Sequence, residues 1–378
     1  MLLIGFLAAA GLLWVSVFGY LLVLVALALR RGRPRPTPPD DELPNITVVV
    51  PVRNEAPLIA AKLADLLGAD YPADRVTTVV VDGGSTDATA ALVEAARANR
   101  AGLELVRVDG ARGKAEQLNA ALRRVRQEVV VVTDVDTALD PACIRALVGT
   151  LMADRSAGVV GARVRPATHL LEERIHWWLL NSLWWLEGEA LGAGAVSGVC
   201  YAVRRSAIAE LPADCAAEDI RVALAANARG YRVRLCRHAL ATELRVPQTL
   251  REFLRFRRRR GAAYVRELLR EPPAGAPRRW HVMRKLRLYY FVVMPTLAAV
   301  AATAGLMLCA TPQWQWTGAG AAAFAVPALG ALFASTTLGA TRRRWWRLSL
   351  AASRLAGLTW LSLLGMPRAV RLQIAPGE

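Results

Sequence analysis

Cysteine and histidine are scarce in this sequence, and neither occurs in a metal-binding pattern. The five cysteines are spread along 378 residues without a C-x-x-C pair: Cys143, Cys200, Cys215, Cys236 and Cys309. A disulfide framework needs paired spacing, as does a zinc site, so this distribution excludes both. His169 and His176 have no partner at metal-ligand spacing, and we interpret them as structural.

Charge is missing from two long stretches. Residues 1–29 and residues 288–341 contain no Asp, Glu, Lys or Arg. The first stretch is long enough for a membrane-spanning helix. The second is long enough for a transmembrane hairpin, with CATPQWQWTGAG as an interfacial turn. A proline- and arginine-rich tether is expected at 30–44. A basic loop with a C-terminal helix, which spans the membrane or lies in its interface, is expected at 342–378.

Positive charge is abundant and comes almost entirely from arginine, which gives a net charge of +17. With 54% apolar residues, the composition predicts a membrane protein rather than a soluble one. The arginines that flank the uncharged stretches place a multi-pass protein in an inner or plasma membrane, with its catalytic domain cytoplasmic. Residues 257–260 lack the interleaved aromatic residues of single-strand binders, so we expect no nucleic-acid partner.

Strands and helices alternate between the uncharged stretches. The β-branched runs Ile46–Val52, Val76–Val81 and Leu103–Val108 are each followed by a helical pattern. This order predicts an α/β domain at 45–247 with a mostly parallel, doubly wound sheet. Basic interfacial helices are expected to follow at 248–287.

Acidic residues stand where predicted strands end. Asp82 follows one strand, and Asp134 and Asp136 follow the run that begins at Val130. Ligands of open α/β sheets bind at such strand ends, and two carboxylates there suit a divalent cation that carries a diphosphate. The alternative for Asp134 and Asp136 is a solvated loop with ordinary surface aspartates, and for Asp82 it is a plain turn between a strand and a helix.

The order PVRNE, DGGSTD, GKAEQLN and DVD resembles the inverting family 2 glycosyltransferases, which have a Rossmann-like GT-A fold. The flanking apolar stretches are similar to those of its membrane-bound branch, the ceramide glucosyltransferases and hopanoid-type enzymes. The resemblance implies roles for six residues. Pro51, Glu55, Asp82 and Lys114 would contact the nucleotide, Asp134 would lie by the ribose and diphosphate, and Asp136 would hold Mg²⁺ or Mn²⁺. Many relatives have Asp where this chain has Gly83.

The same resemblance assigns an acceptor side. Ser197 and Gly198 match a segment that lines it, and Asp219 would be the catalytic base with support from Glu218. The alternative for this acidic pair is charge complementarity at a helix start. A Q-R-R-R-W-like signature aligns with 256–260, which makes Arg259 its matching arginine and puts Arg258 on the acceptor side. Phe256 and Arg260 depart from this signature, and a basic helix lying on the membrane remains an alternative for the run.

Four tryptophans recur at a spacing of seven: Trp177, Trp178, Trp184 and Trp185. They form one stripe along a predicted helix. We expect this stripe either to face lipid and the acceptor, with Trp177 and Trp178 in the acceptor site, or to pack against the sheet.

These features predict transfer of a sugar from a nucleotide sugar, with UDP preferred, to a membrane lipid. Asp219 would deprotonate the acceptor, and the metal would neutralise the leaving diphosphate. One alternative is a processive polysaccharide synthase that uses the same site. A second is a degenerate, non-catalytic membrane protein whose basic face binds anionic lipid.

Overall fold

The structure is a computed structural model that describes residues 42–289 except 112, 193–194 and 272–274, together with residues 4, 7–8, 11–12 and 15–30. The first part of the domain alternates strands and helices as the sequence predicts. Its elements are β1 (Ile46–Val52), α3 (Ala56–Leu67), β2 (Val76–Asp82), α4 (Thr89–Ala98), β3 (Leu103–Arg107), α5 (Lys114–Leu122) and β4 (Val129–Thr133). These four strands are parallel, with β1 between β2 and β4.

The second part of the domain adds two reversed strands, so the sheet is mixed, while the other strands run in one direction and the prediction of a mostly parallel sheet is confirmed. Its elements are β5 (Thr137–Leu139), α6 (Cys143–Ala153), β6 (Ala157–Pro166), α7 (Leu171–Leu191), β7 (Cys200–Arg204), α8 (Glu218–Ala228) and β8 (Arg232–Glu243). The strand order is β3-β2-β1-β4-β7-β6-β8-β5. Strand β7 runs antiparallel to both of its neighbours, and β5 runs antiparallel to β8. Hydrophobic periodicity does not encode strand direction, so the sequence could not show this reversal.

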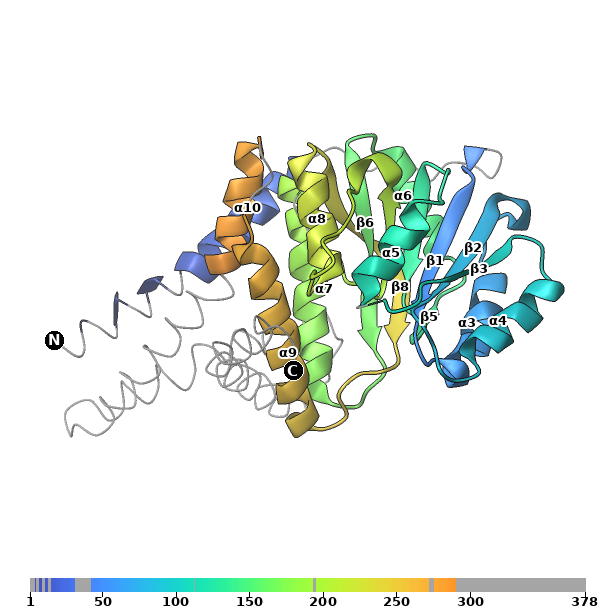
Figure 1. Ribbon diagram of the computed structural model, residues 1–378. Helices are drawn as coiled ribbons and strands as arrows, with labels where there is room; N and C mark the ends of the chain where they lie inside the picture. The colour runs from blue at the N-terminus through green and yellow to red at the C-terminus, as the bar shows by residue number, and fades with distance from the viewer. Residues whose placement is uncertain are drawn as a thin grey trace.

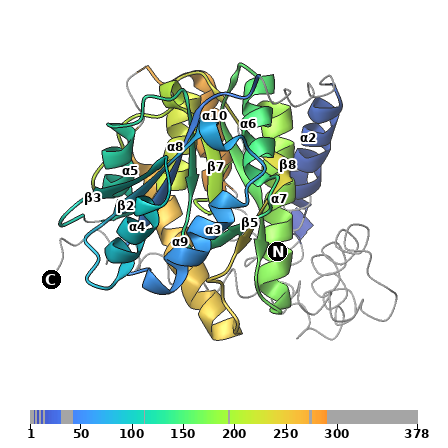
Figure 2. The same cartoon turned by 90° about the vertical axis from the view of Figure 1, so that its right-hand side faces the viewer.

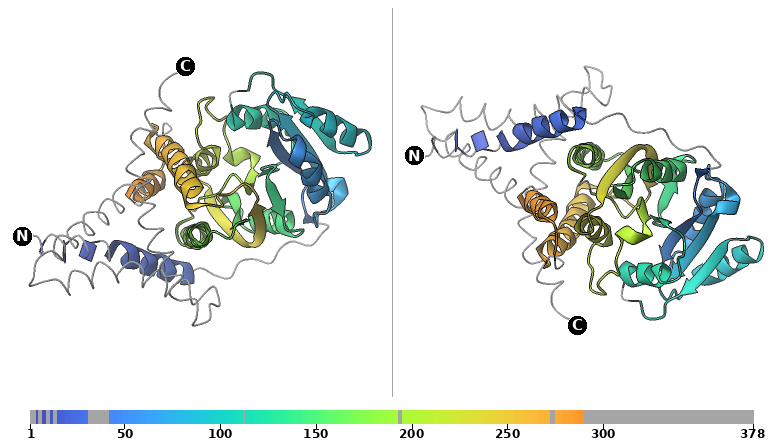
Figure 3. Two further views of the ribbon diagram at one scale, coloured as in Figure 1. Left: turned by 90° about the horizontal axis from the view of Figure 1, so that it is seen from below. Right: turned by 90° about the horizontal axis from the view of Figure 1, so that it is seen from above.

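Helices cover both faces of the sheet, as Figures 2 and 3 show. Along β1, Val48 and Val50 belong to the core formed with α3, α4, α6 and α7, and Val49 belongs to the core formed with α5 and α8. All seven residues of β1 are therefore buried. A strand covered on both sides reads as a continuous apolar run, which is why this strand was recognisable in the sequence.

Four helices pack together at the end of the molecule away from β1, β2 and β3 (Figure 1). They are α2 (Tyr20–Leu29), α7, α9 (Leu250–Leu269) and α10 (Arg278–Leu288). Glu187 of α7 is buried, where it accepts a hydrogen bond from the Tyr20 hydroxyl at 2.8 Å and pairs with Arg287 of α10. This cluster joins α2 to the α/β domain through α7.

The predicted membrane segments fall largely on residues of which nothing is described. Within the described residues, no helix combines the length and the apolar character that crossing a bilayer requires. The predicted hairpin at 288–341 and the C-terminal segment at 342–378 lie outside the described residues, apart from 288–289, as does most of the tether at 30–44.

The tryptophan stripe divides between the core and the surface of α7. Trp177 and Trp184 are buried at 2% and 7% exposure and pack edge to face, with ring centroids 6.2 Å apart. Core packing is therefore correct for these two, and an acceptor role for Trp177 stays a prediction. Trp178 and Trp185 are partly exposed, and the Arg237 guanidinium lies 4.1 Å from the ring centroid of Trp185.

Candidate active site

Asp82 is the last residue of β2 and pairs with Val52, the last residue of β1. The two parallel strands therefore end at the same edge of the sheet. The Asp82 side chain is buried, and one carboxylate oxygen accepts hydrogen bonds from the backbone N–H of Ser85 at 3.0 Å and its hydroxyl at 2.5 Å. Gly84 has φ +81°, which an L-residue with a side chain rarely adopts. The D-G-G turn thus fixes the carboxylate of Asp82 at the end of the sheet.

Steric crowding explains why glycine occupies position 83. A Cβ built there would lie 2.7 Å from Nε2 of Gln117, a buried side chain of α5. That Nε2 donates to the carbonyls of Val52 at 2.7 Å and Val81 at 2.9 Å, so it links the carboxyl ends of β1 and β2. In this chain Gln117 occupies the space that the aspartate of many relatives would need. The sequence analysis did not single out Gln117.

Lys114, the first residue of α5, connects the two sides of the site. Its Nζ lies 2.6 Å from Asp134 Oδ1, just after β4, and 2.6 Å from Glu218 Oε1, at the start of α8. Burial opposes the charge on Lys114, but the two carboxylates outweigh burial and raise the pKa of Lys114 well above its ordinary value. Burial likewise opposes the charge on Glu218, and Lys114 reverses this effect, so the pKa of Glu218 is lowered. The bridge therefore keeps Glu218 ionised.

Gly198 leaves room for this bridge. A Cβ at this position would lie 2.9 Å from both Glu218 Oε1 and Lys114 Nζ. Its backbone N–H donates to Asp219 Oδ2 at 3.1 Å. Ser197, beside it, is buried, and its hydroxyl accepts from the N–H of Val199 at 3.4 Å. The S-G segment thus shapes the site through its backbone.

Asp219 has the protonation behaviour of a base. Burial and the neighbouring charge of Glu218 raise the pKa of Asp219 to about 6. The two adjacent carboxylates differ because Lys114 pairs with Glu218 directly. A general base works best when its pKa lies near the operating pH, and Asp219 meets this condition more closely than Glu218 does.

Asp136 lies two residues after Asp134 and close to a second ion pair. Arg245 binds Glu55 with both of its terminal nitrogens, at 2.6 Å and 2.5 Å, and Glu55 directly precedes α3. Burial and the charge of Asp134 raise the pKa of Asp136, and Arg245 partly offsets them. Arg245 is a site residue that the sequence analysis missed. Pro51 is buried within β1, one residue before the strand ends.

The carboxylates fit a hard divalent cation. Asp134 and Asp136 would offer oxygen ligands, and a bound cation would oppose the burial and the charge of Asp134 that raise the pKa of Asp136. No group of three or more acidic, histidine or cysteine side chains able to hold a metal occurs among the described residues. Mg²⁺ is commonly bound by one or two carboxylates with substrate phosphates and water completing its shell. Asp136 would therefore hold a metal together with a bound diphosphate.

Helix α9 turns different arginines toward the site than the alignment assigned. Arg258 and Arg259 are exposed. Arg257 pairs with the buried Glu173, and Arg260 Nη2 lies 2.7 Å from Glu243 Oε1. The charge of Arg260 partly opposes the rise in the pKa of Asp219, so Arg260 acts electrostatically on this carboxylate. Arg260 departs from the family signature, and the role of the exposed Arg259 stays a prediction.

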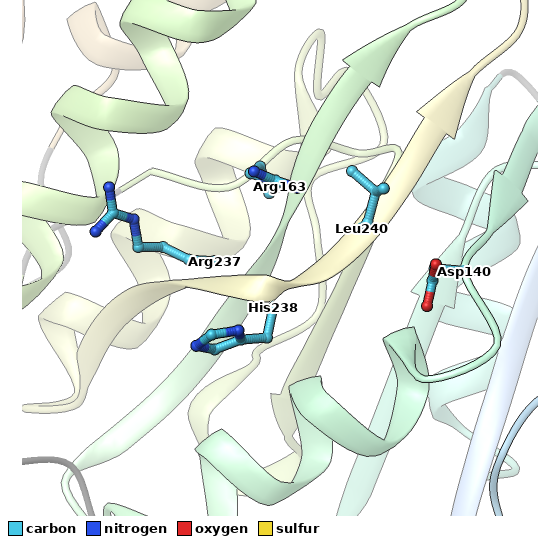
Figure 4. A pocket seen from close by; sticks show the side chains of 5 residues that line it. All are labelled: Asp140, Arg163, Arg237, His238 and Leu240. Carbon is cyan, nitrogen blue, oxygen red and sulfur yellow. The ribbon is translucent and has the colours of Figure 1, made fainter. Parts of the chain in front are cut away.

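A separate hollow of about 540 Å³ lies where β8 bulges away from β6 (Figure 4). Asp140, Arg163, Arg237, His238 and Leu240 line it. The register passes from Cys236 opposite Ala162 to Leu240 opposite Arg163, so three residues of β8 are left unpaired. None of the residues assigned to the nucleotide, the metal or the base lines this hollow.

Comparison with known proteins bears on this arrangement. Residues 47–211 match the model of the Glycosyl transferase family 2. The chain is 26% identical over 279 residues to "Probable glycosyltransferase YdaM" of Bacillus subtilis (strain 168), a match that spans 69% of this chain and 66% of the relative. It is 28% identical over 218 residues to the poly-beta-1,6-N-acetyl-D-glucosamine synthase of Staphylococcus aureus (strain COL), spanning 56% of this chain and 52% of the relative. The matches thus cover between half and two thirds of these relatives.

A solved structure extends the likeness to the fold. The mannosyltransferase PcManGT from Pyrobaculum calidifontis, in complex with GDP-Man and Mn²⁺, superposes with a TM-score of 0.65 at 27% identity. The match covers 94% of this chain and 99% of that chain. Together the comparisons show that residues 47–211 are similar to family 2 glycosyltransferases and that the fold is of the GT-A type, and they support a transferase enzyme.

Proposed function

We propose that this chain moves a sugar from a nucleotide sugar to a lipid acceptor in the membrane, with inversion at the anomeric carbon. The observation that carries the proposal is the Lys114 bridge, which joins Asp134 on the donor side to Glu218 beside the base at 2.6 Å each. The mannosyltransferase that shares the fold holds a nucleotide sugar and Mn²⁺. By analogy Asp82, Glu55 and Lys114 would receive the nucleotide, and Asp134 would lie by its ribose and diphosphate.

Asp219, the metal held at Asp136 and Arg260 would each have a role in the displacement. Asp219 would take the proton of the acceptor hydroxyl while that oxygen attacks the anomeric carbon and the bond to the diphosphate breaks. Its pKa of about 6 suits this role near neutral pH. Bound at Asp136, Mg²⁺ or Mn²⁺ would supply charge neutralisation of the leaving diphosphate. Arg260, within the field of Asp219 and Asp134, would add positive charge as the leaving group departs.

The lipid acceptor is supported by apolar surface on α2. Four large apolar side chains of this helix are at least 40% exposed: Leu22, Val23, Val25 and Leu29. Exposed apolar surface of this kind marks contact with lipid or with another chain. Because Tyr20 ties α2 to α7, contact of α2 with lipid would bring the bilayer to the catalytic domain. We therefore also propose a multi-pass protein in an inner or plasma membrane, with the catalytic domain cytoplasmic.

A processive polysaccharide synthase is the second candidate, because one of the relatives is a poly-beta-1,6-N-acetyl-D-glucosamine synthase. A non-catalytic lipid-binding protein is disfavoured, since the bridge and the raised pKa of Asp219 would have no use in it.

The test is sugar transfer by the full chain in native membranes with Mn²⁺ and radiolabelled UDP- and GDP-sugars. We expect label in the organic extract, loss of labelling with Asp136→Ala and Asp219→Asn, and normal labelling with Asp74→Asn. Asp74 is an exposed aspartate at the start of β2, at the opposite end of the sheet from Asp82, and serves as the matched control. Label that stays in water-soluble polymer favours the synthase. No transfer from any donor, with an intact fold, refutes the proposal.

A further inference from the structure

Lys62 is a buried lysine in a chain that hardly uses lysine. Only three of its 48 Lys and Arg residues are lysines, and Lys62 lies on the face of α3 that packs on the sheet, between the buried Ile59 and Leu66. Its side chain is 0% exposed. Burial lowers the pKa of Lys62, and the nearby Cys200 and Asp65 partly offset this. Burying an ammonium group is costly unless the group is paired and hydrogen-bonded, so its contacts matter.

Lys62 contacts β5 and also Asp65 of its own helix. Its Nζ donates to the carbonyl of Thr137 at 2.8 Å and lies 3.3 Å from Asp65 Oδ2. The same Asp65 carboxylate accepts the backbone N–H of Leu139 at 3.0 Å and 3.2 Å. Among the strands that the structure describes, β5 ends the sheet and pairs only with β8. Lys62 and Asp65 therefore occupy its open edge with one donor and one acceptor, as a neighbouring strand would.

This short strand directly follows Asp136. The carbonyl of Asp136 accepts the N–H of Leu244 at 2.9 Å, on the β8 side. The next carbonyl, that of Thr137, is held from the opposite side by Lys62. The backbone that carries Asp136 is thus fixed on both sides. On the α3 side the contacts come from the side chains of Lys62 and Asp65. If these side chains were removed, no neighbouring strand would supply the missing hydrogen bonds.

We propose that Lys62, braced by Asp65, is a positioning residue that fixes Asp136 in the orientation that binds a divalent cation with the donor diphosphate. This inference rests on the proposed function, in which Asp136 holds the metal. Groups that orient a metal ligand typically change metal affinity by roughly 10–100-fold when they are removed. A residue that only filled the core would change stability instead.

The test is a titration of the full chain with Mn²⁺ in the presence of UDP or GDP. Electron paramagnetic resonance measures the bound and free Mn²⁺. We expect Lys62→Met to bind Mn²⁺ about 10–100-fold more weakly. Lys285→Met, which neutralises an exposed lysine of α10, should bind as the wild type does. In turnover assays Lys62→Met should need more Mn²⁺ for half-saturation, and its donor KM should return to the wild-type value at saturating Mn²⁺.

Asp65→Asn is the second variant, because its side chain is 20% exposed and its loss leaves Lys62 in place. It should also weaken Mn²⁺ binding, and it decides the question if Lys62→Met does not fold. If the folded Lys62→Met variant binds Mn²⁺ with wild-type affinity, the positioning role is overturned and the proposed function stands. Where only Asp65→Asn folds, wild-type Mn²⁺ affinity in that variant has the same meaning. Absence of Mn²⁺ binding in the wild type itself overturns both.

Discussion

Replacing Asp219 with asparagine should inactivate the enzyme and stabilise it at neutral pH. Burial and Glu218 raise the pKa of Asp219 from its ordinary 3.8 to about 6, so the fold holds this carboxylate at a cost. A shift of about two pKa units corresponds to about 3 kcal/mol. Asparagine avoids this cost but accepts fewer hydrogen bonds than the carboxylate, which receives the N–H groups of Gly198 and Ile220. Losing one of them costs about 1 kcal/mol, which leaves a net gain of about 1–2 kcal/mol.

The gain should depend on pH with a defined sign. Between about pH 4 and about pH 6 the folded state keeps a proton that the unfolded state has lost, so wild-type stability falls as pH rises through this window. Above about pH 6 the full cost is present, and below about pH 4 it vanishes. Asp219→Asn should therefore melt above the wild type at neutral pH by a few degrees, and the difference should shrink as the solution is acidified.

The assay is thermal unfolding of both proteins across this pH range, beside kcat measured at each pH. We expect kcat to fall by about 10²–10⁴-fold in Asp219→Asn, with nucleotide binding retained. Asp74→Asn should change neither quantity. A melting difference that is the same at every pH would refute the raised pKa. Undiminished turnover would refute the base assignment.

Three further substitutions test other parts of the site and the core. Gly198→Ala should lower kcat by about 10–100-fold, because its Cβ would lie 2.9 Å from Glu218 Oε1 and Lys114 Nζ; steady-state kinetics check this, and unchanged kcat would show that the bridge tolerates displacement. Arg245→Gln should raise the pKa of Asp136 because the charge of Arg245 lowers it, so acidic pH should impair Mn²⁺ binding more in the variant than in the wild type. Mn²⁺ titrations of both proteins check this, and an equal pH dependence would contradict it. Trp184→Ala should lower the free energy of unfolding by about 3–5 kcal/mol with donor KM unchanged, as chemical denaturation would measure; a small loss would mean that Trp184 faces lipid instead.

The sequence predicted most strands of the first half and the carboxylates that follow them. Ile46–Val52 was placed with its observed bounds, and Asp82 and Asp134 lie at strand ends as expected. These predictions succeeded because a strand buried on both faces is a continuous run of β-branched residues. Polar residues at its carboxyl end then stand out against that run. The roles of these residues in binding or catalysis stay predictions.

The second half was harder because its strands carry charge. Strand β8 reads RVRLCRHALATE, with arginines among its apolar residues, and no strand was predicted there. Its arginines lie near the sheet edge, where Arg234 pairs with Glu189 of α7 at 2.5 Å. Arg245, which follows β8, was also missed, because its role depends on a partner that is distant in the sequence. Its partner Glu55 lies 190 residues earlier, and no local pattern connects the two.

The arginines of α9 could have been assigned correctly from the sequence, by helix phase in place of alignment to a signature. Thr249 and Glu252 form a capping box that fixes where the helix starts, and TLRE is visible in the sequence. Phe253 is the first buried residue of α9, and positions four and seven residues later share its face. These positions are Arg257, which pairs with Glu173 of α7, and Arg260, which pairs with Glu243 of β8. Arg259 lies about 100° away from Arg260, because each residue of an α-helix turns by that angle. A shift of one residue in an alignment therefore moves a charge from the site to the surface.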